Sequence, residues 1–523
     1  MIGMFIRNAI AFALCAYAFY LVLLHNMHMF QLNGYKNDEH INWLRKNLRQ
    51  QWLLGFGALL GLLRIFFPLL VLDILIYLTL VMQILVYRAI RRLNSKKKLV
   101  FTPRVKRMVA TILIITAVVC VLAAIFGGTT RMTGVCMLLV SAQIVANLAA
   151  NVINRPIEEH INQGFINEAK SMLASMPDLT VIGVTGSFGK TSVKYYLQTL
   201  LQGKYSVLVT PGNFNTPLGV TRTVREHLKP THEIFICEMG ARRVGEIKEV
   251  CDIAHPDHGI ITSVGPQHLE TFGSIANIQK TKFELADALP EGGMLFLNGD
   301  NDLIQEKAAE YPRKTFYYSE REGQGYCARD VSVSQRGTEF TVVTPAGETE
   351  RFQMRLIGAH NVINVVGAIA VANSLGMTLQ ELKIPVRRIQ PVEHRMQMTD
   401  HGAVTIIDDA YNSNPVGSKA AVETLAMFDG VKILITPGMV ELGEAEDEYN
   451  RKFGTYAAHC CDYILLVGRD RVRPIREGVL GEGFPTEKCR TFDKLEDALA
   501  YAYAIKEDGH KYILLENDLP DNY

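Results

Sequence analysis

Residues 180–192, TVIGVTGSFGKTS, decide the fold of the larger part of this 523-residue chain. A β-branched run at 180–184 predicts a buried strand, and a helix is expected from about Lys190. Gly186 and Gly189 lie in the turn between them, where glycine lets backbone N–H groups converge on phosphate oxygens. The N-terminus of the helix favours the same anion. The stretch therefore predicts a phosphate-binding loop inside an α/β domain.

The chemistry of such a loop assigns roles to its residues. Lys190 is expected to neutralise the β- and γ-phosphates of ATP, and Thr191 is placed to ligate Mg²⁺. The predicted nucleotide-binding residues of the loop are Thr185, Gly186, Ser187, Gly189, Lys190, Thr191 and Ser192.

Strand and helix patterns continue downstream of the loop. Together they predict a doubly wound α/β domain with its site at the carboxyl ends of the strands. Its strands are expected at 180–184, 205–210, 233–238, 258–263 and 294–298. Short alternating runs within 314–357 predict an antiparallel β insert. A second, Rossmann-like α/β unit is predicted by strands at 403–408, 431–436, 462–467 and 511–516.

The first 150 residues hold almost all the long apolar runs and predict an α-helical membrane domain. A span needs about 20 apolar residues, and five spans are expected, at 8–24, 52–69, 71–87, 108–127 and 133–150. Arg64, Pro68 and Asp73 interrupt the second apolar run, which predicts a hairpin of two spans with the charged residues at the interface.

The loops between the spans set the expected orientation. Segment 88–107 carries nine Lys or Arg and no acid, and segment 35–51 is also basic. Both should be cytoplasmic by the positive-inside rule, which five spans allow. The chain is thus expected to be a multi-pass membrane protein, with residues 151–523 in the cytoplasm.

The predicted domains follow from these patterns. Residues 1–150 form the membrane domain, and 151–175 form an amphipathic connector. Residues 176–389 form the central ATP-binding domain, and 390–523 form the C-terminal domain. The net charge of +1 does not indicate a nucleic-acid partner. Nine cysteines without a C-x-x-C pair predict reduced thiols and no structural zinc site.

The loop spacing T-G-x-x-G-K-T, with Val at position 184, resembles the Mur ligase family, which builds peptidoglycan stem peptides and includes folylpolyglutamate synthases. Further stretches resemble the family in the same order, nearest to its MurF branch, the ligases that add D-alanyl-D-alanine. They are TPGNFNTPLGV (210–220), EIFICEMGARRVGEI (233–247), IITSVGPQHLETFGS (260–274) and NIQKTKFELADAL (277–289).

This resemblance implies site residues in the central domain. Glu238 would bind Mg²⁺, and His268 would help to hold a second metal ion. Lys282 would be the lysine that several Mur ligases carry as a carbamate that binds Mg²⁺, with Lys280 as the alternative. The residues that would line the cleft near the acyl acceptor are Asn213, Asn215 and Thr216. Lys190, His268 and Lys282 are the expected catalytic residues.

The second half of the chain also matches the family. LIGAHNVIN (356–364) implies that Asn361 contacts adenine. Arg395 would reach the ATP phosphates and Asp409 the ribose. Asn412 belongs to the matching D-x-Y-N-x-N-P signature, and residues 431–454 resemble the segment of the family that contains M-x-E-L-G.

The resemblance implies an ATP-dependent carboxylate–amine ligase that acts through an acyl-phosphate, in the synthesis or modification of peptidoglycan precursors. Its substrates would be a small-molecule or lipid-linked carboxylate and an amino acid or dipeptide. Two departures bear on the substrates. The family's soluble UDP-binding domain is replaced here by the predicted spans. The tail LLENDLPDNY (514–523) replaces a K-G-S-R-like ending, and its Glu516, Asp518 and Asp521 would either bind the incoming amine or form an acidic tail.

Other functions stay open at this point. A membrane-bound poly-γ-glutamate-type ligase is a second ligase hypothesis. An ATP-driven transporter of a lipid precursor would predict more polar residues within the spans, and a catalytically inactive membrane scaffold would predict a broken phosphate loop. The intact Lys190, Thr191, Glu238 and His268 favour a ligase.

Overall fold

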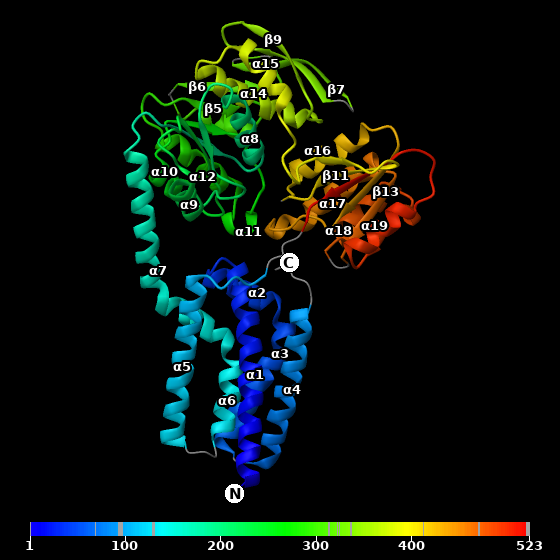
Figure 1. Cartoon of the computed structure of the whole chain (residues 1–523). Coiled ribbons are helices and arrows are strands. Elements are labelled where there is room, and N and C mark those ends of the chain that lie inside the picture. The colour runs from blue at the N-terminus through cyan, green and yellow to red at the C-terminus, as the bar shows by residue number, and fades with distance from the viewer. Residues whose placement is uncertain are drawn as a thin grey trace. The chain divides into compact units, whose positions relative to one another are not determined.

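A computed structural model describes residues 2–67, 69–92, 98–127, 131–311, 314–321, 323, 325–334, 337–411, 413–468 and 471–518. They fall into two compact units that divide between Gln163 and Gly164 (Figure 1). We call residues up to Gln163 the helical unit and the residues from Gly164 the catalytic unit. Pro68, Asn412 and Asp521, which the sequence singled out, lie outside the described residues.

The helical unit consists of seven helices in its described part, the last of which continues into the catalytic unit. They are α1 Ile2–Leu32, α2 Asn37–Lys46, α3 Leu48–Phe66, α4 Leu70–Arg92, α5 Pro103–Gly127, α6 Met132–Ser141 and α7 Gln143–Ala174. Among the described residues, three helices are long and apolar enough to cross a membrane: Ile10–Leu32, Leu70–Arg91 and Pro103–Phe126. The number of five spans stays a prediction.

Two helices occupy the long apolar run at 52–87, and whether both span a membrane stays a prediction. Helix α3 ends at Phe66 and α4 begins at Leu70. Arg64 in the last turn of α3 donates two hydrogen bonds to Asp73 in the first turn of α4, at 2.7 and 3.1 Å. Each charge also suits the dipole of its own helix end. The two charged residues therefore pair with each other across the turn.

The last expected span and the connector differ from their predictions. Helix α6 ends at Ser141, and the chain bends by 69° before α7. Helix α7 then runs without interruption through Pro156 to Ala174, so 151–175 is not a separate connector. At the bend, the Gln143 amide donates to the Leu139 carbonyl oxygen at 3.3 Å, which offers the backbone a partner outside the regular helical ladder.

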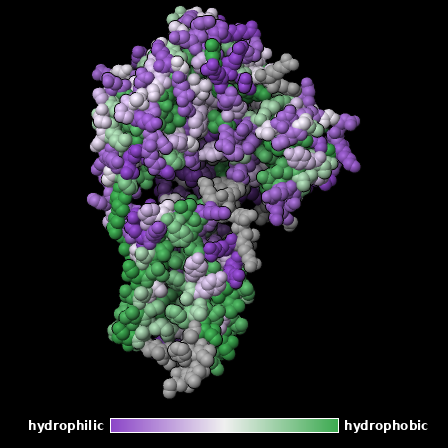
Figure 2. Space-filling model, viewed as in Figure 1, coloured by the Kyte–Doolittle hydropathy of each residue, from purple (hydrophilic) through white to green (hydrophobic). Residues whose placement is uncertain are grey.

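Apolar side chains cover much of the outside of the helical unit, whereas the visible face of the catalytic unit is largely polar (Figure 2). Phe66, Leu70, Ile125 and Phe126 are each at least two-thirds exposed. Soluble monomers seldom expose apolar surface on this scale, and such surface marks contact with a membrane or a partner.

The catalytic unit begins with a nine-stranded sheet in the order β2-β3-β1-β4-β5-β6-β7-β8-β9. Its strands are β1 Thr180–Thr185, β2 Val207–Val209, β3 Ile234–Glu238, β4 His258–Ile261, β5 Leu295–Asn298, β6 Thr315–Ser319, β7 Tyr326–Ser334, β8 Gly337–Val343 and β9 Thr349–Met354. The order reverses beside β1, which makes the carboxyl ends of β1, β3 and β4 the switch point where ligands bind in such sheets.

Helices cover both faces of the parallel strands. One face packs against α8 Lys190–Leu201, α14 Ala359–Ser374 and α15 Leu379–Arg388. The other packs against α9 Pro217–His227, α10 Glu246–Ala254, α12 Ile275–Ala288, α13 Asp302–Ala308 and the end of α7. Along β1, Ile182 faces the first core and Val181 the second, as the two-residue period of a strand requires. The short helix α11 Leu269–Phe272 follows β4.

The expected antiparallel insert was partly wrong. Strands β7, β8 and β9 are antiparallel to one another, but β6 pairs in parallel with both β5 and β7. The insert therefore extends the main sheet. Strand β7 escaped prediction because its pairing shifts between Arg329 and Ser332, and Asp330 there has a positive φ of 52°. Such a bulge breaks the alternation on which the prediction depends.

A second, six-stranded sheet forms the C-terminal part, in the order β10-β11-β15-β12-β13-β14. The strands are β10 Gln397–Asp400, β11 Val404–Asp409, β12 Val431–Thr436, β13 Tyr463–Val467, β14 Cys489–Phe492 and β15 Lys511–Glu516. Helices α16 Pro415–Ala426, α17 Glu446–Cys460 and α18 Arg473–Gly481 cover one face, and α19 Leu495–Ala504 covers the other. The predicted fold class, two α/β domains after a helical region, is confirmed.

Candidate functional site

The phosphate-binding loop connects β1 to α8 at the switch point of the first sheet. Gly186 and Gly189 have φ values of 153° and 82°. A β-carbon on Gly186 would lie 2.1 Å from Thr262 Oγ1, so only glycine fits against the strand end of β4. The loop is thus held by close backbone packing rather than by its own side chains alone.

Hydrogen bonds fix the first half of the loop. The N–H groups of Ser187 and Phe188 donate to the carbonyl and hydroxyl oxygens of Ser263, both at 2.8 Å. The Ser187 hydroxyl donates to the Gly265 carbonyl at 3.0 Å, and the Thr185 hydroxyl to the Met239 carbonyl at 2.9 Å. These groups hold the loop in place. The N–H groups in the first turn of α8 have no acceptor within the helix and remain for an anion; Ser192 lies buried in that turn.

Lys190 folds back over the loop. Its ammonium donates to the carbonyl oxygens of Gly186 at 2.6 Å and Ser187 at 3.0 Å. Burial lowers the pKa of Lys190 to about 8; Glu238 opposes this shift and Arg395 adds to it. The lysine stays mainly protonated at neutral pH, directly above the loop that is expected to hold phosphates.

Glu238 is the carboxylate at the end of β3, next to the loop. It accepts hydrogen bonds from Thr191 Oγ1 at 3.2 Å and from Asn215 Nδ2 at 3.0 Å, and Lys194 Nζ lies 2.8 Å from its other oxygen. Burial alone would raise its pKa, but Lys194 and Lys190 lower it below the usual value. Glu238 is therefore an anion among polar partners, as a metal ligand needs to be.

Lys194 was not among the predicted site residues. Its side chain is fully buried, and its ammonium also donates to the Gly212 carbonyl at 2.8 Å. Lys194 lies one turn after Lys190 on the face of α8 that packs inward, so a lysine at that helical spacing was the available signal.

The three residues that were predicted to line the cleft near the acyl acceptor differ in their environments. Asn215 contacts Glu238, and its carbonyl accepts the Gly240 N–H at 2.8 Å. Thr216 caps α9, because its hydroxyl accepts the Gly219 N–H at 3.3 Å. Asn213 is exposed. Only Asn215 lies beside the carboxylate of the expected metal site.

His268 links the two α/β parts of the catalytic unit. Its Nδ1 forms a short contact with Glu441, which follows β12, and Glu441 also lies 3.2 Å from Arg242 Nη2. Burial lowers the pKa of His268, and the neighbouring Glu441 opposes that shift. Glu441 lay in a matched segment, but no role was predicted for it. Its signal was the M-x-E-L-G pattern.

The two candidate lysines on α12 differ sharply. Lys280 is exposed, whereas Lys282 is 1% exposed. Lys282 Nζ lies 5.9 Å from the centre of the Phe272 ring, and among the described residues no hydrogen bond or ion pair of its ammonium is found. Burial, with a contribution from Lys190, lowers its pKa well below 10.5.

The hinge, which is the segment between α15 and the second sheet, carries Arg395, and Asp409 ends β11 of that sheet. Arg395 Nη2 lies 3.4 Å from Thr191 Oγ1, and its guanidinium stacks 5.0 Å from the centre of the Tyr411 ring. Asp409 accepts the Met396 N–H at 3.2 Å. Burial raises the pKa of Asp409 to about 6, although Arg395 and that hydrogen bond lower it. The hinge thus brings a cation to the phosphate-binding loop.

Asn361, the predicted adenine contact, forms hydrogen bonds within the protein through both groups of its amide. It accepts from the Tyr196 hydroxyl at 2.9 Å and donates to the Ile357 carbonyl at 2.9 Å. A contact with adenine would require one of these bonds to be exchanged. Its role stays a prediction.

Glu516 ends β15 in the middle of the second sheet. Its carboxyl group accepts hydrogen bonds from the hydroxyls of Ser413 and Thr436. Burial raises its pKa to about 8, and nearby Asp409 adds to the shift. Asp518 is exposed. The acidic residues of the tail therefore do not form one cluster in the described part of the chain.

Comparisons with known proteins identify the family of the chain. A family model described as the Mur ligase middle domain matches residues 184–372, and one described as the Mur ligase glutamate ligase domain matches 394–515. The UDP-N-acetylmuramoyl-tripeptide–D-alanyl-D-alanine ligase of Escherichia coli is 30% identical over 369 residues, which cover 68% of this chain and 80% of that protein. The ligase of the same name from Bacillus subtilis is 33% identical over 63% of this chain and 71% of its own length.

Solved structures give the same result. The crystal structure of MurF from Acinetobacter baumannii has a TM-score of 0.63 and 25% identity, and covers 68% of this chain and 77% of that one. MurF from Thermotoga maritima in complex with ADP has a TM-score of 0.62 and 26% identity, with 68% and 80% covered. With a phosphate-binding loop and an adjacent carboxylate at the switch point, the chain belongs to the Mur ligase family, as an ATP-dependent ligase of the MurF type that forms peptide bonds.

Proposed function

We propose that this protein is a membrane-anchored MurF-type ligase of peptidoglycan precursor synthesis, which joins a dipeptide of the D-alanyl-D-alanine kind to the peptide carboxylate of a muramoyl precursor. The observation that carries the proposal is the convergence of Lys190, Thr191 and Glu238 in a chain whose relatives bear the MurF name. The precursor is UDP-linked or lipid-linked, and the two are separated below by experiment.

The reaction balances in two steps. A carboxylate oxygen of the precursor bonds to the γ-phosphorus of ATP, ADP leaves, and an acyl-phosphate forms. The amine of the dipeptide then attacks the acyl carbon, phosphate leaves, and the amine gives up a proton. Lys190 and the N–H groups of the first turn of α8 hold the phosphoryl oxygens as charge develops. Arg395 at Thr191 adds a second cation.

The residues at the loop fit Mg²⁺. This ion takes one or two carboxylates, with substrate phosphates and water as its other ligands, and Glu238 with the Thr191 hydroxyl offers such a partial set. Magnesium neutralises phosphate charge when bound. Among the described residues no cluster of three His, Cys, Asp or Glu is found, which agrees with a metal held largely by substrate oxygens.

A carbamate on Lys282 would help to hold a second metal ion. Carbamate formation needs an unprotonated amine, and burial lowers the pKa of this lysine strongly. The neutral amine nitrogen bonds to the carbon of CO₂ and gives up a proton, so that a buried neutral group becomes an anion. In this proposal His268 would hold the metal in place of its contact with Glu441, and Asp409 and Asn361 would hold the ribose and adenine of ATP.

The helical unit supports a location in the bacterial membrane, with the catalytic unit in the cytoplasm. Three described helices have the length and hydropathy of a span, and the family models begin only at residue 184. A membrane anchor brings the ligase to the surface where lipid-linked precursors are found.

The decisive assay is detection of the amide product by mass spectrometry with the detergent-purified full-length protein. UDP-linked and lipid-linked muramoyl tripeptide are offered in parallel with D-Ala-D-Ala and ATP. Product is expected with at least one precursor, and Lys190→Ala should abolish it while Lys280→Ala, an exposed lysine, should not. ATP hydrolysis without a requirement for the dipeptide would overturn the proposal and favour a transporter. Complete absence of turnover with either precursor would favour a scaffold.

A further inference from the structure

One face of α7 is polar over its first four turns, within the helical unit. Its residues are Gln143, Asn147, Asn151, Asn154 and Glu158. The intervals of four, four, three and four residues place these side chains on one side of the helix. All are buried or half-buried. We call them the polar stripe. Burying such residues among apolar helices costs free energy, and these residues commonly mark a functional site.

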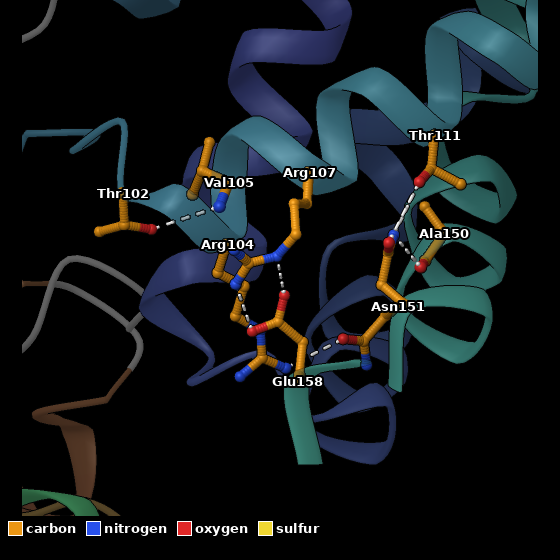
Figure 3. A network of polar contacts seen from close by, with 9 residues as sticks. Thr102, Arg104, Val105, Arg107, Thr111, Ala150, Asn151 and Glu158 are labelled. Carbon is orange, nitrogen blue, oxygen red and sulfur yellow. Dashed lines mark hydrogen bonds and ion pairs between the residues drawn. The ribbon is translucent and has the colours of Figure 1, made fainter. Parts of the chain in front are cut away.

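The second half of the polar stripe is fully partnered, mainly by α5 (Figure 3). Glu158 accepts two hydrogen bonds from Arg107, at 2.7 and 2.8 Å. Asn154 and Thr111 are hydrogen-bonded, and Asn151 accepts from Arg104 at 3.1 Å. This half therefore serves to join helices.

In the described chain, the first half of the polar stripe has one side-chain hydrogen bond, from Gln143 Nε2 to the Leu139 carbonyl oxygen at 3.3 Å. Both polar atoms of the Asn147 amide and the Gln143 Oε1 atom are buried without a hydrogen bond, and so are both polar atoms of Asn26 on α1. In the described chain, 14 buried side-chain atoms lack a hydrogen bond. Of these, 11 belong to residues between Asn26 and Asn147 of the helical unit. Proteins rarely leave buried amides without a hydrogen bond, so each of these groups is expected to have a partner from outside the described chain.

Two of the unpartnered residues lie beside one apolar cluster. On α1, Asn26 lies between Leu23 and Phe30, which share this cluster with Ala150 of α7, and Asn147 is one turn before Ala150. Beside Gly57 of α3, a β-carbon would lie 2.7 Å from the unpartnered Ser141 Oγ and 3.0 Å from Gln83 Nε2. Ser141 and Gln143 thus flank the break between α6 and α7, and Asn26 and Asn147 lie beside the cluster that contains Ala150.

An apolar groove ends at the same break. It has a volume of about 380 Å³ and is lined only by aliphatic side chains of α3, α5 and α6 and by the residue at the break. The lining residues are Ile65, Val119, Leu122, Ala123, Val135, Leu138, Leu139 and Ala142. Ser141 and Gln143, the neighbours of Ala142, carry unpartnered polar atoms.

We propose that the helical unit binds a lipid with one long hydrocarbon chain, whose chain lies in the apolar groove and whose polar head is hydrogen-bonded by Gln143, Asn147 and Asn26. A purely polar ligand would leave the groove empty, and a bare hydrocarbon would leave the amides unpartnered. A single groove takes one chain, which favours a polyprenyl-type lipid over a two-chain phospholipid. The inference goes beyond ligase activity, and binding requires neither ATP nor turnover.

The test is photolabelling of the full-length protein in phosphatidylcholine nanodiscs with a diazirine-bearing polyprenyl phosphate. Saturable labelling is expected within residues 119–123 and 135–142, which line the groove. Ala123→Trp, which fills the groove, should reduce the label by roughly tenfold or more. Val121→Trp is the matched control on the same helix, because Val121 is 58% exposed and does not line the groove. Equal labelling of the two variants, or equal labelling by a diazirine-bearing phosphatidylglycerol, would overturn the proposal.

A second variant separates ligand binding from helix packing. Asn147→Leu removes two unpartnered buried atoms, so the melting temperature without added lipid should stay unchanged or rise. Its labelling should nevertheless fall by roughly tenfold. If labelling is retained, or if the melting temperature falls as it would for an amide bonded to buried water, the proposal is wrong. Both readouts are independent of the ligase assay.

Discussion

The buried ion pair of Lys194 and Glu238 makes a quantitative prediction for Lys194→Met. The two charges lie 2.8 Å apart with side chains 0% and 2% exposed. At an effective dielectric constant near 20, their attraction is about 6 kcal/mol. Loss of one partner from a buried pair typically costs about 3–5 kcal/mol, because the remaining charge is left uncompensated. We expect a loss of that size in the stability of the catalytic unit.

For a unit of this size, that loss corresponds to a fall in melting temperature on the order of 4–7 °C. Calorimetry is the suitable assay, since Trp43 and Trp52, the two tryptophans of the chain, lie in the helical unit and do not report on the catalytic unit. Lys248→Met is the matched control. Its pair with Asp252 is an exposed pair within one helix and contributes little.

The pH dependence of the effect follows from the pKa of Glu238, which is lowered in the wild type. A lowered pKa contributes stability above the unfolded value of 4.5 and loses it as the pH falls. In Lys194→Met, burial should instead raise the pKa of Glu238. The difference in stability between Lys194→Met and the wild type should therefore become smaller as the pH falls. A fall no larger than that of Lys248→Met at pH 7 would refute the reasoning.

Three further predictions concern single side chains. The raised pKa of Glu516, about 8, contributes stability that is complete below pH 4.5 and is lost as the pH rises through about 8. In Glu516→Gln, the melting temperature should therefore not show the fall that this loss causes over that pH range. A curve of melting temperature against pH equal to that of the wild type would contradict the prediction. The KM for ATP should rise as the pH falls through about 6, where Asp409 takes up a proton, and Asp409→Asn should show a high KM at every pH; a KM equal to that of the wild type would remove Asp409 from the ATP site. Lys282→Met should lower kcat by about 10²-fold or more and be partly rescued by short carboxylates, whereas Lys280→Met should be silent; wild-type activity that is indifferent to removal of CO₂ would exclude the carbamate.

The sequence predicted the parts of the fold whose signals are local. Strand periods and the glycine-rich turn predicted β1, the loop and α8, and the approach of Thr191 to Glu238 followed from motifs at the ends of neighbouring strands. These succeeded because a phosphate-binding loop needs particular residues at fixed spacing.

Features that depend on tertiary contacts were not predictable. The contact of His268 with Glu441 joins residues 173 positions apart, and no local pattern encodes it. The bend between α6 and α7 falls inside an apolar run whose hydropathy predicted one straight span. The helical spacing of Lys194 from Lys190 indicates a shared face of α8, but only the packing of α8 shows that its ammonium is buried beside Glu238. Burial alone also separates Lys282 from Lys280.

The central claim is that this chain activates a carboxylate by phosphorylation before an amine attacks it. The most direct measurement is the transfer of oxygen-18 from the labelled carboxylate of the muramoyl peptide to inorganic phosphate, followed by phosphorus NMR during turnover with ATP and D-Ala-D-Ala. The account predicts that each phosphate released carries one oxygen from the carboxylate, and that Lys190→Ala releases none. Phosphate without oxygen-18 would mean that water, not the carboxylate, accepts the phosphoryl group, and would contradict the ligase mechanism.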